Sequence, residues 1–153
     1  MSNTFTTKIA IKAPISAVWN ALATEEGISK WFLSKAKLDV RSGGAFEFFW
    51  GDISTTGTFL NVIPEKKLSF TWWEPVGAVT FELEEINDNE VAVICTATGY
   101  KTDDDGLRHY IEESKGWTFF MVNLKASLEH GLDLRDGNPT RTCQSGWLNS
   151  SAG

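Results

Sequence analysis

The N-terminal part of the chain shows two hydrophobic patterns in succession. Phe5, Thr7, Ile9 and Ile11 alternate with Thr6, Lys8 and Ala10. This period of two predicts a strand over about residues 4–12. Pro14 ends this strand because it has no N–H to donate to a sheet, and it suits the first turn of a helix. Apolar side chains then recur at helical spacing, which predicts two short helices. These side chains are Ile15, Val18, Trp19 and Leu22 in the first helix and Ile28, Trp31 and Phe32 in the second.

From about residue 36 to residue 98 the pattern changes to short apolar segments separated by turn residues. Because these segments are consecutive and joined by short turns, we expect six antiparallel strands. A long helix is predicted over about residues 107–131, where apolar side chains return every three, four or seven positions. The apolar stripe of this helix consists of Tyr110, Trp117, Met121, Leu124 and Leu128.

This order of elements indicates an α+β protein in which a curved antiparallel sheet wraps around a long C-terminal helix. A sheet with one apolar face needs a cover, and only the last helix is long enough to provide it. The two short helices after the first strand would close one end. Gly131 suits the C-terminal cap of the long helix, and the residues beyond it are polar apart from Trp147-Leu148. We therefore expect one domain over residues 1–132 and a polar, flexible tail over residues 133–153.

Charge and cysteine usage narrow the classes of partner. The 153-residue chain has a net charge of −6, and its lysines and arginines are scattered. This composition argues against nucleic acid and an anionic membrane surface as partners. No apolar run approaches the roughly 18 residues of a membrane span, and residues 1–12 show no signal peptide. Because Cys95 lies in an apolar run and Cys143 in a polar one, no disulfide is expected, and we predict a cytoplasmic location.

Several segments resemble one known family. They are Ile11 to Leu22, Glu26 to Phe32, Gly57-Thr58-Phe59-Leu60, Leu68 to Trp72, and Gly116-Trp117 with Asn123-Leu124-Lys125 and Leu128-Glu129. Together they resemble the activator of heat-shock protein 90 ATPase homologue-like family, within the START-like superfamily (SRPBCC, similar to the birch-pollen allergen). The resemblance covers about residues 5–132. It implies a helix-grip fold with an apolar cavity between the sheet and the C-terminal helix, and it leaves the ligand open.

The sequence predicts no catalytic residues, no metal site and no cofactor. His109 and His130 would lie about 30 Å apart if both are on the long helix, at roughly 1.5 Å per residue. Two histidines at this separation cannot share a metal ion. No metal-binding, phosphate-binding or nucleophile motif occurs at the required spacing. Glu47 stands between Phe46 and Phe48 and is the one candidate for a polar group on a cavity wall.

The function favoured by these patterns is the binding of a small apolar molecule between the sheet and the helix. The many Trp and Phe residues of this chain supply the candidate walls. The candidates are Trp31, Phe48, Trp50, Phe70, Trp72, Trp117 and Met121, with Glu47 as a possible polar handle. Two alternatives remain: an enzyme of the cyclase, dehydratase or hydrolase type that acts on apolar substrates, and a stress-related protein that binds a chaperone partner. A buried ionisable group on the cavity wall would favour the enzyme.

Overall fold

Seven strands form one antiparallel sheet in the order β1-β7-β6-β5-β4-β3-β2. The computed structural model describes residues 3–72 and 77–136. The strands are β1 (Asn3–Ile11), β2 (Lys35–Leu38), β3 (Ala45–Trp50), β4 (Ile53–Ile63), β5 (Lys67–Thr71), β6 (Ala78–Asn87) and β7 (Glu90–Tyr100). The helices are α1 (Ile15–Ala23), α2 (Glu25–Ser29) and α3 (Asp104–His130). The predicted class, element order and helix-grip arrangement are thereby confirmed.

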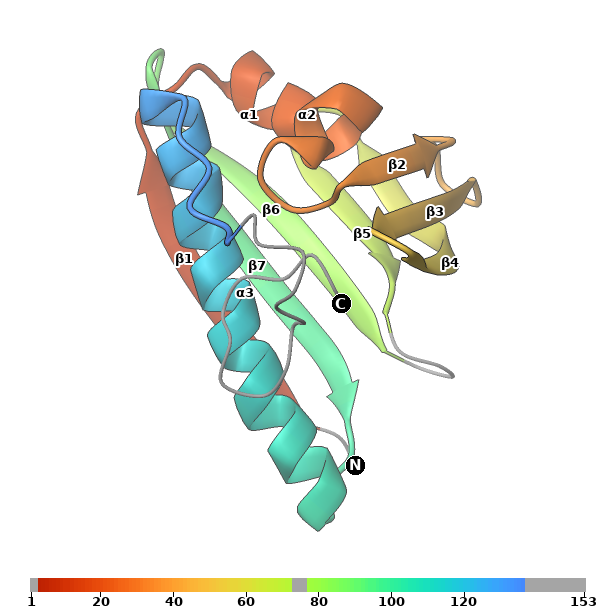
Figure 1. Cartoon of the computed structure of the whole chain (residues 1–153). Helices are drawn as coiled ribbons and strands as arrows, with labels where there is room; N and C mark the ends of the chain where they lie inside the picture. The colour runs from red at the N-terminus through yellow and green to blue at the C-terminus, as the bar shows by residue number, and fades with distance from the viewer. Residues whose placement is uncertain (1–2, 73–76, 137–153) are drawn as a thin grey trace.

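The long helix lies along one face of the sheet, over β1 and β7, and the two short helices cover one end (Figure 1). Strands β2, β3 and the start of β4 bend away from the rest of the sheet, which gives the sheet its curvature (Figure 1). The first strand pairs with the last, so β1 and β7 lie side by side under α3. The concave face of the sheet and the inner face of α3 therefore enclose the hydrophobic core.

Capping residues set the start of α2 and both ends of α3. The Thr24 hydroxyl accepts a hydrogen bond from the Gly27 N–H at 2.9 Å and so begins α2. The Asp103 carboxylate accepts one from the Gly106 N–H at 2.7 Å, so α3 begins three residues before the predicted start at residue 107. Asp104 and Asp105 follow in its first turn, where negative charge is favourable. Gly131 ends α3 in the left-handed conformation, at a φ of 67°.

Two polar contacts join the end of α3 to β1. The Glu129 carboxylate accepts a hydrogen bond from the Lys12 N–H at 2.8 Å, and Lys125 donates to the Ala10 carbonyl at 2.6 Å. Lys125 also pairs with Glu129 one helical turn away. The hydrogen bond from the Lys12 backbone and the one from Lys125 hold the pKa of Glu129 below its usual value.

The segment that follows α3 is bound to the domain through Asn123, which is fully buried. Its amide nitrogen donates to the Trp31 carbonyl at 2.8 Å and to an oxygen of Asp133 at 3.1 Å. Its amide oxygen accepts a hydrogen bond from the Leu134 N–H at 2.7 Å. Asn123 therefore connects α3 with Trp31, two residues beyond α2, and with the segment beyond its own helix.

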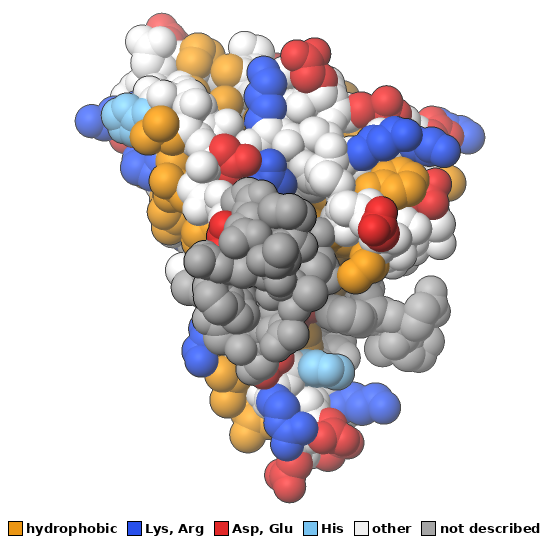
Figure 2. All heavy atoms as spheres, in the orientation of Figure 1, with side chains coloured by type: hydrophobic (Ala, Val, Ile, Leu, Met, Phe, Trp, Pro, Cys, Tyr) orange, Lys and Arg blue, Asp and Glu red, His pale blue; other side chains and the backbone are white. Residues whose placement is uncertain are grey.

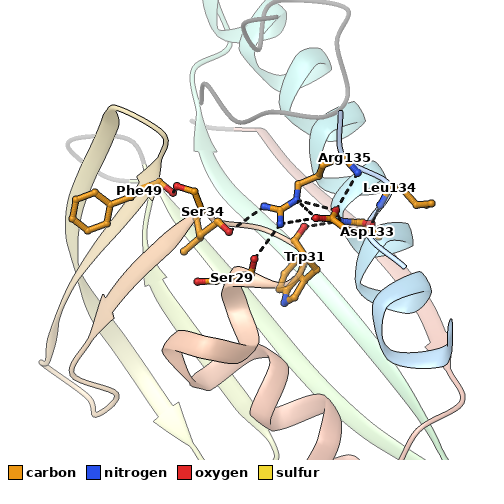
Figure 3. Close-up of polar contacts among 9 residues, drawn as sticks. Ser29, Trp31, Ser34, Phe49, Asp133, Leu134 and Arg135 are labelled. Carbon is orange, nitrogen blue, oxygen red and sulfur yellow. Dashed lines mark hydrogen bonds and ion pairs between the residues drawn. The ribbon is translucent and has the colours of Figure 1, made fainter. Parts of the chain in front are cut away.

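Arg135 extends this connection to the end of α2, where its side chain points toward Ser29 and Asp133 (Figure 3). We call Asn123, Asp133 and Arg135 the C-terminal latch. Arg135 donates to the Ser29 carbonyl at 3.0 Å, to the Leu33 carbonyl at 3.1 Å and to Asp133 at 2.9 Å. Residues 133–135 thus make hydrogen bonds to the rest of the domain, and the boundary at residue 132 stays a prediction. The rest of the predicted tail, 137–153, lies outside the described residues.

The described surface carries charges of both signs without a basic stripe on the face that Figure 2 shows. No helix among residues 3–72 and 77–136 is both long and apolar enough to cross a membrane. Cys95 is buried as a free thiol, and Cys143 lies outside the described residues.

Candidate functional site

The predicted wall residues come together in the interior between the sheet and α3, and all but Trp72 are buried. Trp72 is half-buried. Phe32, which was not among the predicted wall residues, lies at the centre of this group. Its ring centroid is 4.9–6.2 Å from those of Trp31, Phe48, Trp50, Trp72, Trp117 and Phe120.

Much of the predicted cavity is therefore occupied by side chains around Phe32. Phe70 closes this cluster from β5, with centroid distances of 5.5 Å to Phe48 and 6.1 Å to Trp72. Trp31 is held in place because its indole N–H donates to the Ala21 carbonyl at 2.8 Å. Edge-to-face and offset contacts of this kind are the favourable geometries for aromatic pairs, so the rings pack as a core.

Glu47 lies on the opposite face of the sheet from the predicted cavity. Along β3, Phe46, Phe48 and Trp50 are buried, and Glu47 alternates with them. Its carboxylate is 3.8 Å from the Lys37 ammonium on the neighbouring strand. The prediction of Glu47 as a polar handle inside the cavity is corrected by this alternation.

Glu47 instead borders an open groove of about 740 Å³ on the outer side of β2, β3 and β4. The groove is lined by charged and small polar side chains as well as by Phe46. One of these, Glu25, uses a carboxylate oxygen to accept a hydrogen bond from the Leu38 N–H at 2.9 Å. Within the described parts of the chain, no three His, Cys, Asp or Glu side chains gather closely enough to hold a metal ion.

A polar group does lie at the interior, but it comes from α3. The Trp72 indole N–H donates to the Glu113 carboxylate at 2.9 Å. Glu113 is half-buried and lies one helical turn before Trp117, so the two side chains share a face of α3. The Trp72 and Trp117 rings are in contact, with centroids 5.4 Å apart. Glu113 therefore adjoins the aromatic cluster on the side of the N-terminal half of α3.

The inner face of β7 completes this region with Cys95, Ala97 and Tyr100, all buried. Burial raises the pKa of the Cys95 thiol and of the Tyr100 hydroxyl, and the negative charge of Glu113 raises both pKa values further. Both groups therefore stay protonated at neutral pH. We call Trp72, Cys95, Tyr100, Glu113 and Trp117 the Glu113 cluster.

Two hydrogen-bonding atoms of the Glu113 cluster are buried and have no hydrogen-bond partner within the described residues. They are the Tyr100 hydroxyl and the Trp117 indole nitrogen. Leaving a buried donor unpaired costs about 1–3 kcal/mol, and such groups are rare in folded proteins. An arrangement of this kind can hold a molecule that supplies the missing acceptors.

A backbone irregularity brings Tyr100 into the cluster. Residues 95 and 97 of β7 face inward, so strict alternation would place Gly99 inward and Tyr100 outward. The pairing of β1 with β7 shifts register between Asn3 and Phe5, and Gly99 adopts a φ of 98°. Tyr100 consequently packs against Phe5 at 5.6 Å and Tyr110 of α3 at 5.9 Å between ring centroids.

Sequence reasoning missed Phe32, Tyr100 and Glu113 as members of the site. A signal for Glu113 existed, because it precedes Trp117 by four residues on the predicted apolar stripe. No comparable signal existed for Tyr100, whose inward orientation depends on the bulge. Phe32 was recognised only as an apolar residue of the second short helix.

Comparison with known proteins shows the family. The sequence model described as "Activator of Hsp90 ATPase homolog 1-like protein" matches residues 12–129. Among curated proteins, none matches the sequence. A crystal structure from Staphylococcus saprophyticus has 21% sequence identity and a TM-score of 0.74, with 88% of this chain and 98% of that chain covered.

Two further solved structures share the fold. The Aha1 dimer from Colwellia psychrerythraea has 21% identity and a TM-score of 0.69, covering 84% of this chain and 98% of that one. DynU16, a protein of the dynemicin biosynthetic locus, has 19% identity and a TM-score of 0.72, covering 84% of this chain and 48% of that one. Because the family model spans most of the sequence, the chain belongs to the family of activator of Hsp90 ATPase homolog 1-like proteins.

Proposed function

We propose that this protein binds a small, mainly apolar molecule between the inner face of the sheet and the N-terminal half of α3. The observation that carries the proposal is the pair of buried, unpartnered polar atoms in an otherwise aromatic interior: the Tyr100 hydroxyl and the Trp117 indole nitrogen. A bound molecule that pairs them would recover the free energy that their burial costs. Apolar walls with a few polar groups are typical of small-molecule sites.

The proposed site lies next to the aromatic rings that surround Phe32 and not among them. The predicted wall residues Trp31, Phe48 and Trp50 have ring neighbours around Phe32, so we assign them to the core. Trp72 and Trp117 form the boundary between that core and the proposed site. Opposite α3, β7 contributes Cys95 and Ala97, two small side chains that are both fully buried.

The family and its structural neighbours support a ligand-binding role. Membership of a START-like family is consistent with a module that binds small molecules. DynU16, a neighbour in fold, comes from the dynemicin biosynthetic locus. These likenesses support the class of function, and the Glu113 cluster supports its position in this chain.

Titration with Nile red, an uncharged dye that becomes fluorescent in apolar surroundings, tests the proposal. We expect saturable binding with a Kd in the micromolar range or weaker. Ala97→Leu should abolish it with little loss of stability, because the added carbon atoms would enter the ligand space. Thr98→Leu is the matched control, since residue 98 faces the other side of the sheet and should leave binding unchanged.

Two results would contradict the proposal. One is an absence of saturable Nile red binding to the parent protein. The other is retained binding in Ala97→Leu together with a loss of about 1–3 kcal/mol in the free energy of unfolding, the cost expected for overpacking a solid core.

Glu113 is the observation that favours an enzyme as the second candidate. A half-buried carboxylate beside an apolar site is suited to donate or accept a proton. If the protein is an enzyme, Glu113→Gln should abolish turnover of a bound molecule while leaving its affinity within about a few fold. A molecule recovered chemically unchanged after prolonged incubation with the parent protein would contradict this second candidate.

A further inference from the structure

The chemistry of the unpartnered atoms restricts what can bind at the Glu113 cluster. An indole nitrogen such as that of Trp117 only donates hydrogen bonds. The Tyr100 hydroxyl stays protonated, so it is available as a donor as well. The third donor in the cluster, the Trp72 indole N–H, is already bonded to Glu113. The site therefore has two hydrogen-bond donors that lack acceptors.

The charge of the cluster restricts the ligand further. Glu113 supplies negative charge close to Tyr100 and Cys95, as its effect on both pKa values shows. Within residues 3–72 and 77–136, no lysine, arginine or histidine is among the buried residues. An anionic ligand would thus lose its water next to the Glu113 carboxylate. No buried lysine or arginine of the described residues would compensate its charge. Burying a charge without a partner is far more costly than burying a neutral acceptor.

We propose that the molecule bound at this site is uncharged and carries a carbonyl or ether oxygen that accepts a hydrogen bond from Trp117 or Tyr100. This inference rests on the proposed function and specifies its ligand class. Neutral aromatic ketones and ethers fit this class, whereas fatty acids and other carboxylates do not. The rings of Trp72 and Trp117 would contact the apolar body of such a molecule.

Three probes of nearly the same size separate the contributions. They are 2-acetylnaphthalene, a neutral acceptor; 2-ethylnaphthalene, which lacks an acceptor; and 2-naphthoate, which is an anion. Affinities are measured on the full chain by two-dimensional ¹H–¹⁵N NMR titration, in which the Trp117 indole N–H gives its own signal. Trp117→Phe identifies that signal by its disappearance.

The ketone should bind about 5- to 10-fold more tightly than the hydrocarbon, the gain expected for one hydrogen bond. Its preference should disappear in Tyr100→Phe or in Trp117→Phe, whichever variant removes the donor that it contacts. Tyr110→Phe is the matched control, because Tyr110 packs against the Tyr100 ring and its hydroxyl is not one of the unpartnered buried atoms. It should retain the preference.

The outcomes distinguish this inference from the proposed function. Three results would overturn the inference while leaving a ligand site in place. The first is equal affinity for the ketone and the hydrocarbon, and the second is a preference for the ketone that both Tyr100→Phe and Trp117→Phe retain. The third is binding of 2-naphthoate as tight as that of the ketone. Binding of none of the three probes would overturn the proposed function itself. Because Tyr100→Phe removes only one hydroxyl, it remains a usable test even if Trp117→Phe does not fold.

Discussion

Asn123→Ala should lower the free energy of unfolding by about 3 kcal/mol, because Asn123 joins three parts of the chain. Its side chain makes three hydrogen bonds, to the Trp31 carbonyl, the Asp133 carboxylate and the Leu134 N–H, at 2.7–3.1 Å. At roughly 0.5–1.5 kcal/mol net for each bond, their loss costs about 1.5–4.5 kcal/mol. The side chain is fully buried, so water cannot readily replace these partners.

Urea unfolding followed by far-ultraviolet circular dichroism measures this loss. Thr118→Ala on the same helix is the control, since Thr118 is exposed and bonds only within its own helix. It should change the free energy of unfolding by less than about 0.5 kcal/mol. A loss below about 1 kcal/mol for Asn123→Ala would refute the idea that the C-terminal latch stabilises the domain.

A double-mutant cycle tests whether the latch acts as one unit. Arg135 reaches Asn123 through Asp133, and it also donates to the carbonyl of Ser29 at the end of α2 and to that of Leu33 beyond it. The effects of Asn123→Ala and Arg135→Ala should therefore be less than additive, with a coupling energy of about 0.5–3 kcal/mol. Strict additivity would show that the two residues stabilise the segment independently.

Three further outcomes follow from the packing and the charges. Gly57→Ala should lose about 1–3 kcal/mol of stability in urea unfolding, because its Cβ would lie 2.3 Å from the Phe46 ring; unchanged stability would show that the ring moves aside. Met121→Trp should lose a similar amount, since Met121 is fully buried in the core, and a neutral result would indicate open space there. The pKa of Glu129 is lowered by hydrogen bonds from the Lys12 backbone and Lys125; at Asp133, hydrogen bonds outweigh the effect of burial and lower the pKa. The two carboxylates therefore stabilise the folded state above about pH 4, which is near their pKa values in the unfolded chain. This stabilisation should be lost as the pH falls through their lower pKa values in the folded protein. A urea midpoint that does not change between pH 7 and pH 2 would contradict the prediction.

The sequence determined the secondary structure because that information is local. Alternation from Phe5 to Ile11 and the helical stripe through Trp117 and Met121 record which side of each element is apolar. Short turns required the middle strands to be antiparallel, and the need to cover one face of the sheet placed the long helix against it. The helix begins at Asp104, three residues before the predicted start, because the Asp103 side chain caps it ahead of the apolar stripe from which the start was predicted.

The tertiary structure decided which side chains meet and whether space remains between them. Phe32 fills the middle of the predicted cavity because the turn after α2 brings its ring against Trp117 and Phe120 of α3, a contact that local periodicity does not encode. The bulge at Gly99 turns Tyr100 inward toward Glu113, which lies on a separate element. An unpaired hydrogen-bonding group can be recognised only when every neighbour of its atom is known. The two buried donors of the proposed site, on Tyr100 and Trp117, therefore depend on the packing of several elements and cannot be found from one segment.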